Sequence, residues 1–381
     1  MNKKVLIINS FLNTSQFLVD LLEELSQLDY SFYLLSSTSG IYNKFKQNKW
    51  LARKIYLGSN LIKAKYWQQL FFIFFYPLAF LIYLVILVFY KYNQKIKTII
   101  CLNWNEKIIF TPLAKILKLN IIWLEYPETN YRALNKLLLW LYKSFSQGIR
   151  IIVFNSLSKT QLKNLGVRED SIKVIQPGIK LNQFKRQETI FHTIAQVDQK
   201  RQGHKFFTIG TVTQLNKRQN MEILFQAVKK CLTVIPSLQL VVMGDERERK
   251  DLIWLAKKME IDSLVWFVSQ ESYLRKWLDS FDVFVLTTPK PDLDDLGMIL
   301  KAMAAKIPVI AFRNLGLEDI IIEDKTGALI EIDNSETLTQ EVIRLGQDKR
   351  LRVRLGQKAQ ERVDKDFSIS SVVKELAKLI V

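Results

Sequence analysis

The stretch DLDDLGMILKAMAAKIPVIA, Asp292–Ala311, joins a short acidic loop to a helix and then to an apolar strand. Its glycine, Gly297, is predicted to open a helix over Met298–Ala305, and Pro308–Phe312 is predicted to be a buried strand. The first backbone N–H groups of a helix have no partner within it, so this helix start can face an anion, whereas an ordinary turn would use glycine there as well. The stretch predicts an α/β unit and leaves both interpretations of Gly297 open.

Apolar runs of strand length alternate with helix-like segments through both halves of the chain. Most of these runs are continuously apolar, which is typical of parallel strands that are buried on both faces. The predicted strands are Lys4–Asn9, Ser31–Ser36, Thr98–Asn103, Asn120–Glu125, Arg150–Phe154, Ile172–Gln176, Phe206–Val212, Leu238–Met243, Leu264–Val268, Asp282–Leu286, Pro308–Phe312 and Ala328–Ile332. The predicted helices are Ser15–Leu28, Tyr66–Tyr90, Lys107–Leu117, Tyr131–Phe145, Ser158–Leu165, Met221–Val234, Arg247–Met259, Ser272–Asp279, Met298–Ala305, Ser335–Gly346 and Leu351–Val363. This order predicts the α/β class, with a doubly wound, Rossmann-like sheet in each half.

The length of the chain predicts two domains. Single hydrophobic cores stop growing near roughly 250 to 300 residues, and the chain has 381. The polar stretch 186–204 shows no periodicity and is predicted to be a linker between an N-terminal domain, 1–185, and a C-terminal domain, 205–365. Ligands of two such domains are expected at the carboxyl ends of their strands, in a cleft between the sheets.

The positive charge is concentrated in the N-terminal half. Residues 1–190 hold 26 Lys and Arg against 10 Asp and Glu, a net charge of +16, whereas residues 191–381 hold 29 against 27, a net charge of +2. Such a surface attracts phosphates, either of nucleic acid or of anionic lipid. The aromatic residues gather in an apolar run rather than among the lysines, so a nucleic-acid-binding module is not indicated. We therefore predict an anionic membrane surface, and no nucleic acid, as a partner.

That apolar run is YWQQLFFIFFYPLAFLIYLVILVFY, residues 66–90, and it carries no charged side chain. It is long enough to span a bilayer, but the predicted strands before and after it belong to one sheet, which a span would separate. Pro77 and the many aromatic residues suit a helix, broken or continuous, that lies in the membrane interface or packs under the sheet. Interfacial attachment is the preferred prediction, and a wholly buried helix and a true span are the alternatives.

The cysteines and the N-terminus indicate a cytoplasmic protein. Cys101 and Cys231 lie far apart in regions that read as buried, with no metal-ligand spacing, so we expect free thiols in a reducing compartment. The N-terminal MNKKVLIINSF has an apolar run of strand length without a cleavage site, and it is predicted to be a first strand rather than a signal peptide. His192 and His204 both lie near or in the predicted linker, so no catalytic histidine is expected.

The segments IGTVTQLNKRQNMEILFQA, LQLVVMGDE, FDVFVLTTP, LGMILKAMAAKIPVIA and LEDIIIEDKTGALIE follow one another between Phe206 and Val363. In order and spacing they resemble the donor domain of family 4 glycosyltransferases, which are retaining enzymes with the GT-B fold. The N-terminal half resembles the same family more loosely, through TIICLNWNEKIIFTPLAKILKLNIIWLEYPE and FNSLSKTQLKNLGVREDSIKVIQPGI. The resemblance implies two Rossmann-like domains, with the closing helix, 366–381, crossing back to the first.

The resemblance also implies an activity. A hexosyl-type glycosyltransferase would move a sugar from a nucleotide-diphosphate sugar, of UDP or GDP type, to a lipid-linked or cell-surface glycan with retention. It would be peripheral, at the inner face of the cell membrane. The family requires no metal, so although Asp292, Asp294 and Asp295 superficially resemble a metal-binding motif, we expect neither metal nor other cofactor.

Two sets of site residues follow from the resemblance. Asp294 is the candidate for contact with the donor sugar, and Glu125, which otherwise is a structural carboxylate, is the candidate for contact with the acceptor. The candidate donor-binding residues are Gly210, Thr211, Gln214, Lys217, Arg218, Gly244, Gly297, Met298 and Ile299. Gly210 would let a phosphate approach the backbone, and Lys217 would reach the diphosphate unless it is an ordinary solvated lysine. Gly244 could equally be a purely structural strand end.

The chain departs from the family at several of these positions. Gln214 stands where members carry an arginine that helps to clamp the diphosphate, unless Arg218 replaces it. Matching AMA to AMA puts Lys301 at the second glutamate of the acidic signature and Leu293 at the first, whereas matching the glycine puts Asp294 at the first and Ala302 at the second. Either way the second carboxylate is missing.

The N-terminal half departs as well. The glycine-rich loop after the first strand is replaced by SFLNTSQ, and Glu125 or Tyr126 stands where the family often has a histidine. A catalytically degenerate GT-B protein that acts as a glycan- or partner-binding subunit is therefore the alternative to an active enzyme.

Overall fold

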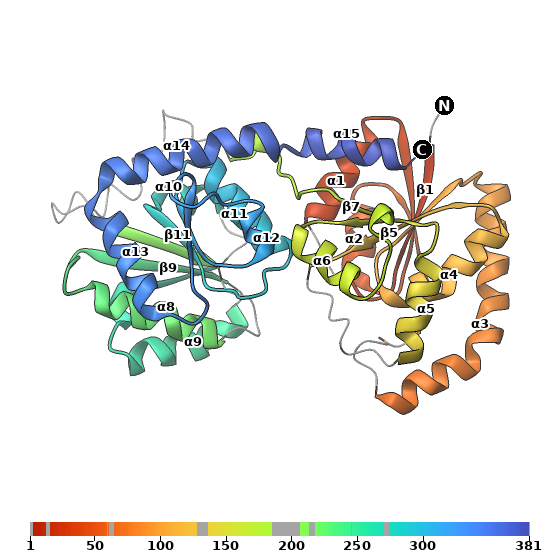
Figure 1. The fold of residues 1–381 in the computed structure, drawn as a ribbon, viewed down its shortest axis with the longest axis horizontal. Coiled ribbons are helices and arrows are strands. Elements are labelled where there is room, and N and C mark those ends of the chain that lie inside the picture. The colour runs from red at the N-terminus through yellow and green to blue at the C-terminus, as the bar shows by residue number, and fades with distance from the viewer. Residues whose placement is uncertain are drawn as a thin grey trace. The chain divides into compact units, whose positions relative to one another are not determined.

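The computed structural model describes residues 3–12, 16–58, 60, 65–127, 136–184, 206–212, 218–244, 246–269 and 274–380. The chain divides into two compact units, each built on a parallel sheet flanked by helices (Figure 1). The first unit comprises Met1–Pro177, Asp292–Asp294 and Ile369–Val381, and the second comprises Gly178–Pro291 and Asp295–Ser368. The predicted linker lies outside the described residues.

Within the described residues the sheet of the first unit has seven strands, all parallel. In their order across the sheet they are β3 (Leu51–Lys54), β2 (Tyr30–Ser36), β1 (Lys3–Asn9), β4 (Thr98–Cys101), β5 (Asn120–Glu125), β6 (Arg150–Val153) and β7 (Ile172–Val174). The sequence predicts all of these except β3. That edge strand reads LARK and is largely exposed, so it lacks the apolar run by which buried strands are recognised.

The helices of the first unit are α1 (Gln16–Ser26), α2 (Ser39–Gln47), α3 (Tyr66–Asn93), α4 (Trp104–Ile116), α5 (Lys136–Ser146), α6 (Ser156–Asn164) and α15 (Ile369–Leu379). The short α2 was not predicted. It is weakly apolar, and only Ile41 and Phe45 are buried in it.

The apolar run 66–90 forms the long helix α3. The helix continues through Pro77, so the break considered there is absent; a proline removes one backbone hydrogen bond without necessarily ending a helix. The alternative of a wholly buried helix is wrong, because Phe74 is 78% exposed and Val85 is 69% exposed. In the part of the chain that the structure describes, no helix has the length and apolarity needed to cross a membrane.

One face of α3 packs on the core of the first unit. Tyr83, Leu87 and Tyr90 are buried there, with residues of β1, β4, β5 and α4. The helix α15, near the end of the chain, packs on α1 in the same unit. Its backbone accepts hydrogen bonds from the first sheet, at 3.2 Å from the Tyr30 hydroxyl to the carbonyl of Ala377.

Within the described residues the sheet of the second unit has six parallel strands, all of them predicted. In their order across the sheet they are β10 (Val265–Ser269), β9 (Leu238–Gly244), β8 (Phe207–Val212), β11 (Val283–Leu286), β12 (Val309–Phe312) and β13 (Gly327–Ile330). The helices around it are α8 (Arg218–Cys231), α9 (Glu246–Lys258), α10 (Leu274–Ser280), α11 (Leu293–Ala304), α12 (Leu315–Glu318), α13 (Ser335–Gln347) and α14 (Lys349–Asp366).

Each sheet reverses its order of winding at one point. In the first sheet, β1 lies between β2 and β4, and in the second, β8 lies between β9 and β11. At such a switch point, the loops after the two neighbouring strands run to opposite faces of the sheet. A crevice forms between these loops, and doubly wound folds bind their ligands there. These two points locate the candidate sites.

Candidate functional site

The carboxyl edge of the second sheet at β8 and β11 is the first candidate site. Thr211, in β8, is 1% exposed, and its hydroxyl donates a hydrogen bond of 2.7 Å to the carbonyl of Val285 in β11. Directly after β11 the chain continues with Thr287 and Thr288, which are both buried. The side chain of Thr211 therefore links the two strands that flank the switch point, and small polar side chains follow β11.

Gly210 lies inside β8 and pairs with Val241 on one side and Phe284 on the other. A Cβ atom at this position would lie 2.0 Å from the ring of Phe281. The glycine is required because that aromatic ring occupies the space above the strand, which accounts for it without a phosphate.

The helix α11 begins at Leu293, five residues earlier than predicted. Aspartates near a helix N-terminus are favourable because they interact with the positive end of the helix dipole, and here Asp294 and Asp295 occupy the first turn. The predicted helix start at Gly297 is therefore wrong. Gly297, Met298 and Ile299 lie inside the helix, where backbone N–H groups bond to carbonyls four residues earlier and do not project toward an anion.

The position of Gly297 inside α11 allows the effect of an alanine substitution on the free energy of unfolding to be predicted. A Cβ atom there meets nothing within 4 Å, and alanine is favoured over glycine inside a helix by roughly 0.5–1 kcal/mol. Gly297→Ala is expected to raise the free energy of unfolding by about that amount and to leave nucleotide binding unchanged, which denaturant unfolding and calorimetric titration with UDP would measure. A variant that is more stable but binds UDP poorly would mean that the donor approaches the chain at this glycine.

The aspartates at the start of α11 differ in their exposure to solvent. Asp294, the candidate for the donor sugar, is exposed, whereas Asp295 is 2% exposed. Further along α11, the ammonium group of Lys301 lies 5.4 Å from the centre of the Phe184 ring, a cation–π contact. In the described ranges no group of three or more His, Cys, Asp or Glu side chains is placed to hold a metal ion. The roles of Asp294 and of the metal-free donor site stay predictions.

The remaining donor candidates are described only in part. Gln214 and Lys217 lie outside the described residues, and Arg218 is the first residue of α8. Gly244 is the last residue of β9 and is half-buried. Because parallel strands end at one edge of a sheet, Gly244 lies at the same carboxyl edge as Thr211.

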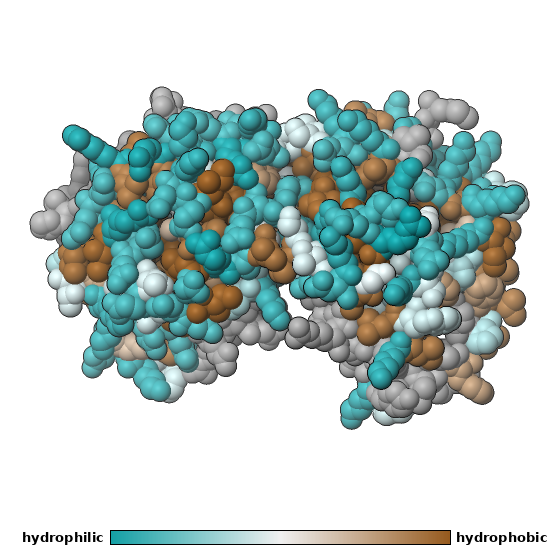
Figure 2. Space-filling view, in the orientation of Figure 1, coloured by the Kyte–Doolittle hydropathy of each residue, from teal (hydrophilic) through white to brown (hydrophobic). Residues whose placement is uncertain are grey.

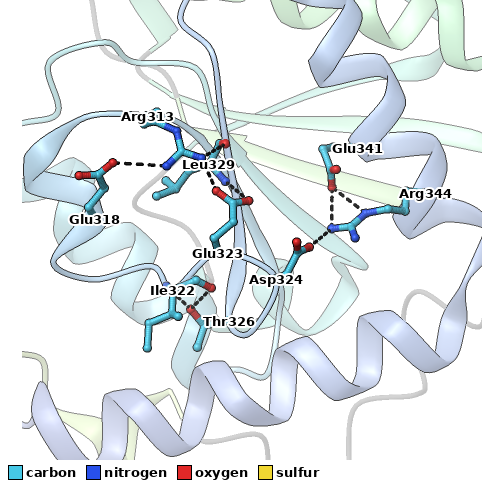
Figure 3. Close-up of polar contacts among 9 residues, drawn as sticks. All are labelled: Arg313, Glu318, Ile322, Glu323, Asp324, Thr326, Leu329, Glu341 and Arg344. Carbon is cyan, nitrogen blue, oxygen red and sulfur yellow. Dashed lines mark hydrogen bonds and ion pairs between the residues drawn. The ribbon is translucent and has the colours of Figure 1, made fainter.

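At the end of β12, Arg313 is bound by carboxylates (Figure 3). Its guanidinium donates hydrogen bonds to Glu318 at 3.3 Å, to Glu323, and to the carbonyl of Leu329 at 3.0 Å. Nearby, Arg344 donates to Asp324 at 2.7 Å. The charge of Arg313 is thus balanced by two glutamates. Its hydrogen bonds stabilise the connection between β12 and β13, and a guanidinium already paired in this way is a weak candidate for binding a diphosphate.

Glu125, the acceptor candidate, lies at the carboxyl end of β5 and is completely buried. Its Oε1 atom accepts hydrogen bonds of 2.6 Å from the ammonium group of Lys107 and 2.6 Å from the hydroxyl of Tyr142. Lys107, in α4, is itself 1% exposed and also donates to the carbonyl of Leu124 at 2.8 Å. This arrangement favours the structural interpretation of Glu125, because a fully buried carboxylate cannot touch an acceptor while it remains in this position.

The switch point of the first sheet, between β1 and β4, holds a second buried network that the sequence analysis missed. Glu106 accepts hydrogen bonds from the backbone N–H of Asn103 at 2.6 Å and from the hydroxyl of Ser10 at 2.5 Å. Asn103 in turn donates to the side chain of Asn9 at 3.0 Å. Burial raises the pKa of Glu106, and the hydrogen bond from Ser10 opposes this rise.

The signal for this network is present in the sequence. Asn103 and Glu106 have the three-residue spacing of a capping box, and they form one at the start of α4. The part that the sequence could not show is the contribution of Ser10, which comes from the loop that replaces the family's glycine-rich loop. In this chain side-chain hydrogen bonds connect the segments that follow β1 and β4 at the switch point of the first sheet.

Both cysteines are free and buried, as predicted. Burial raises the pKa of Cys101 well above its ordinary value and raises the pKa of Cys231 to about 12. A raised pKa keeps a thiol in its protonated form, and the thiolate is the nucleophilic form.

Comparison with known proteins relates the second unit to glycosyltransferases. Residues 194–362 match the family model described as Glycosyl transferases group 1. The N-acetyl-alpha-D-glucosaminyl L-malate synthase of Bacillus anthracis is 26% identical over 165 residues, which are 43% of this chain and 42% of that protein. The lipopolysaccharide core biosynthesis glycosyltransferase LpsE of Rhizobium meliloti is 25% identical over 164 residues, 43% of this chain and 46% of LpsE. The chain spans less than half the length of these curated relatives.

Solved structures show similarity along the whole chain. Anabaena Alr3699/HepE, in its complex with UDP, matches with a TM-score of 0.77 and 15% identity over 99% of each chain. At that identity the likeness shows the fold alone. The predicted fold class is confirmed: the chain has the GT-B fold, with two Rossmann-like α/β units.

Proposed function

We propose that the chain is a hexosyl-type glycosyltransferase that moves a sugar from a nucleotide-diphosphate sugar to a lipid-linked or cell-surface glycan acceptor. The observation that carries the proposal is the match of residues 194–362 to the glycosyl transferases group 1 model. The match covers a sheet that reverses its winding between β8 and β11, which is where doubly wound sheets bind ligands. The donor site is thus assigned to the carboxyl edge of the second sheet.

A UDP-sugar is the first donor to test, because the structural neighbour HepE was solved with UDP. Retention of the anomeric configuration follows from the resemblance to family 4. In such a transfer the enzyme must stabilise the negative charge that develops on the departing diphosphate, and positive groups placed beforehand do this most effectively. The groups proposed for this role are Lys217, which directly precedes α8 in the sequence, and Arg218, the first residue of α8.

A cell-surface glycan is proposed as the acceptor because LpsE, one of the relatives, acts in lipopolysaccharide core biosynthesis. A lipid-linked acceptor would be held at a membrane surface, so the enzyme is proposed to be peripheral at the inner face of the cell membrane. The excess of positive charge in residues 1–190 supports this location, since anionic lipid attracts lysine and arginine.

Calorimetric titration with UDP, GDP and their common sugars tests the donor site. Saturable binding of one nucleotide is expected. Lys217→Ala removes the proposed contact to the diphosphate and is expected to weaken that binding at least about tenfold, which corresponds to roughly 1.4 kcal/mol. The matched control is Lys257→Ala, which removes an exposed lysine in the last turn of α9 and is expected to change nothing.

Equal binding by the Lys217→Ala variant and the unchanged protein would count against the assignment of Lys217. Retention would be tested separately, by the anomeric configuration of the first product that NMR detects. An inverted product would exclude the family 4 mechanism while leaving the donor site in place.

A catalytically degenerate GT-B protein that binds a glycan or a partner transferase is the second candidate function. Two observations favour it. Lys301 stands where the resemblance calls for a carboxylate, and Glu125 is sequestered in a buried ion pair. Failure of all the nucleotides to bind would select this candidate over the enzyme.

A further inference from the structure

Where the structure describes its side chains, the outward face of α3 is apolar. Its exposed large side chains follow one another at helical spacing, and their exposed fractions run from 45% at Phe89 to 78% at Phe74. These side chains are Trp67, Phe74, Leu78, Leu81, Ile82, Val85, Phe89 and Tyr92. We call this set the α3 stripe. Figure 2 shows apolar residues along the edge of the first unit where α3 lies in Figure 1.

A helix on the surface of a globular protein normally turns its charged side chains outward. In α3 both faces are apolar, because Tyr83 and Leu87 pack on the core while the α3 stripe lies outside. Monomeric proteins rarely expose contiguous apolar patches larger than a few hundred Å², and larger ones mark sites of contact with a membrane or another protein. The α3 stripe gathers eight exposed large apolar side chains on one helix and is the candidate for such a contact.

The charges around the α3 stripe indicate what covers it. Between Tyr30 and Asn105 the sequence has 10 Lys and Arg and no Asp or Glu. Lys65 directly precedes the helix, and Lys95 and Lys97, both exposed, follow it. A helix whose exposed face is apolar in the middle and flanked by lysines at both ends complements a bilayer with anionic headgroups, to which each lysine near the surface contributes about 1 kcal/mol.

The positions of the aromatic side chains agree with this. Trp67 lies near one end of the α3 stripe and Tyr92 at the other, and both are more than half exposed. Tryptophan and tyrosine favour the boundary between headgroups and acyl chains, where an apolar ring can be buried while its polar atom stays hydrated. The aliphatic residues Leu78, Leu81 and Val85 lie between them.

A second copy of this chain fits the α3 stripe less well. Two α3 helices packed against each other would bring the lysines at their ends near those of the partner, and the surrounding sequence offers no carboxylate between Tyr30 and Asn105 to pair with them. Like charges that face each other across an interface oppose association. Anionic lipid supplies the missing negative charge.

We infer that the α3 stripe is a docking surface by which the first unit binds the plane of an anionic membrane. The helix lies in the interface with its stripe among the acyl chains and its flanking lysines at the headgroups, and it does not need to cross the bilayer. The inference deepens the proposed function and rests on it in one respect, namely that the acceptor is presented at a membrane.

Flotation of the full chain with phosphatidylcholine vesicles, with and without about one third phosphatidylglycerol, tests the inference. The chain is expected to bind the anionic vesicles, to bind neutral ones much less, and to lose affinity as salt is raised. Leu81→Gln/Val85→Gln places two polar groups in the α3 stripe and is expected to weaken binding at least about tenfold. Both positions are more than half exposed, so the fold is retained.

The matched control is Trp254→Gln/Trp266→Gln, which replaces two exposed apolar residues of the second unit, 54% and 57% exposed. This variant is expected to bind vesicles like the unchanged chain. Lys95→Gln/Lys97→Gln is expected to bind anionic vesicles more weakly and neutral vesicles unchanged, which would identify the lipid charge as the partner of these lysines.

Three results would overturn the inference: no vesicle binding by the unchanged chain, equal binding by the α3 variant, or a dimer in sedimentation that the α3 variant abolishes without any vesicle binding. Titration with UDP in the absence of lipid keeps the two proposals apart. If the unchanged chain binds UDP but no vesicles, the docking surface alone is rejected, and if it binds vesicles but no nucleotide, the proposed transferase alone is rejected.

Discussion

Lys107→Ala is expected to lower the free energy of unfolding of the first unit by about 3–5 kcal/mol, the range found when one partner of a buried ion pair is removed. The lysine and its partner Glu125 are 1% and 0% exposed, and their charged atoms lie 2.6 Å apart. Without the ammonium group, the buried carboxylate of Glu125 loses the positive charge that balances it and keeps the hydrogen bond from the Tyr142 hydroxyl. Denaturant unfolding followed by the fluorescence of the buried Trp104 and Trp123 would measure the loss.

Two further variants separate the ion pair from simple loss of packing. Lys107→Met/Glu125→Gln removes both charges while keeping much of the side-chain volume, and it is expected to recover more than half of the lost stability, because no unpaired charge is buried. Lys229→Ala breaks an ion pair of 2.9 Å to Glu260 in which the side chains are 51% and 81% exposed, and it is expected to cost less than about 1 kcal/mol. Equal effects of Lys107→Ala and Lys229→Ala would contradict the buried network.

Gly210→Ala is expected to destabilise the second unit by about 3 kcal/mol or more. The added methyl group would lie 2.0 Å from Phe281, and a close-packed sheet centre gives way only by shifting the strand or the ring. Phe281 is 6% exposed, so its ring has little room to move outward. The measurement is the midpoint of denaturant unfolding, compared with that of Gly297→Ala, where the same substitution meets open space.

The double variant Gly210→Ala/Phe281→Leu decides the cause. If the clash with the ring is responsible, leucine makes room for the methyl group. The loss in free energy of unfolding of the double variant is then expected to be smaller than the sum of the losses in the two single variants. A Gly210→Ala variant of unchanged stability that no longer binds UDP would restore the original prediction, in which the glycine admits a phosphate.

The strands of this fold could be predicted because their signal is local. A parallel strand buried on both faces is a continuous apolar run, as in Phe207–Val212, and it reads the same whatever lies beside it. The edge strand Leu51–Lys54 has exposed side chains and therefore no such run. The start of α11 was missed because aspartates are favourable both in a loop and in a first helical turn. The glycine that follows them therefore became the predicted start of the helix.

The sequence predicted at which edge of each sheet the candidate site lies, but it predicted the surroundings of the individual site residues less well. The order of the segments located Thr211 and Gly244 at the carboxyl edge of a sheet. The same order located Glu125 at the corresponding edge of the first sheet, but it could not show that Lys107, 18 residues away in the sequence, would bury and neutralise it. A pattern of residue types gives the place of a side chain in an element and not its neighbours in space.

By itself, the sequence determined two doubly wound α/β units, the length of the apolar helix α3, and the lack of carboxylates around it, because each of these is written in consecutive residues. Only the tertiary structure decided that Gly210 faces the ring of Phe281, that Glu125 is closed off by Lys107 and Tyr142, and that one face of α3 is covered while the other is exposed. The physical reason is the same in all three cases. Burial and pairing depend on which distant side chains the fold brings within van der Waals or hydrogen-bond distance, and no local pattern encodes that.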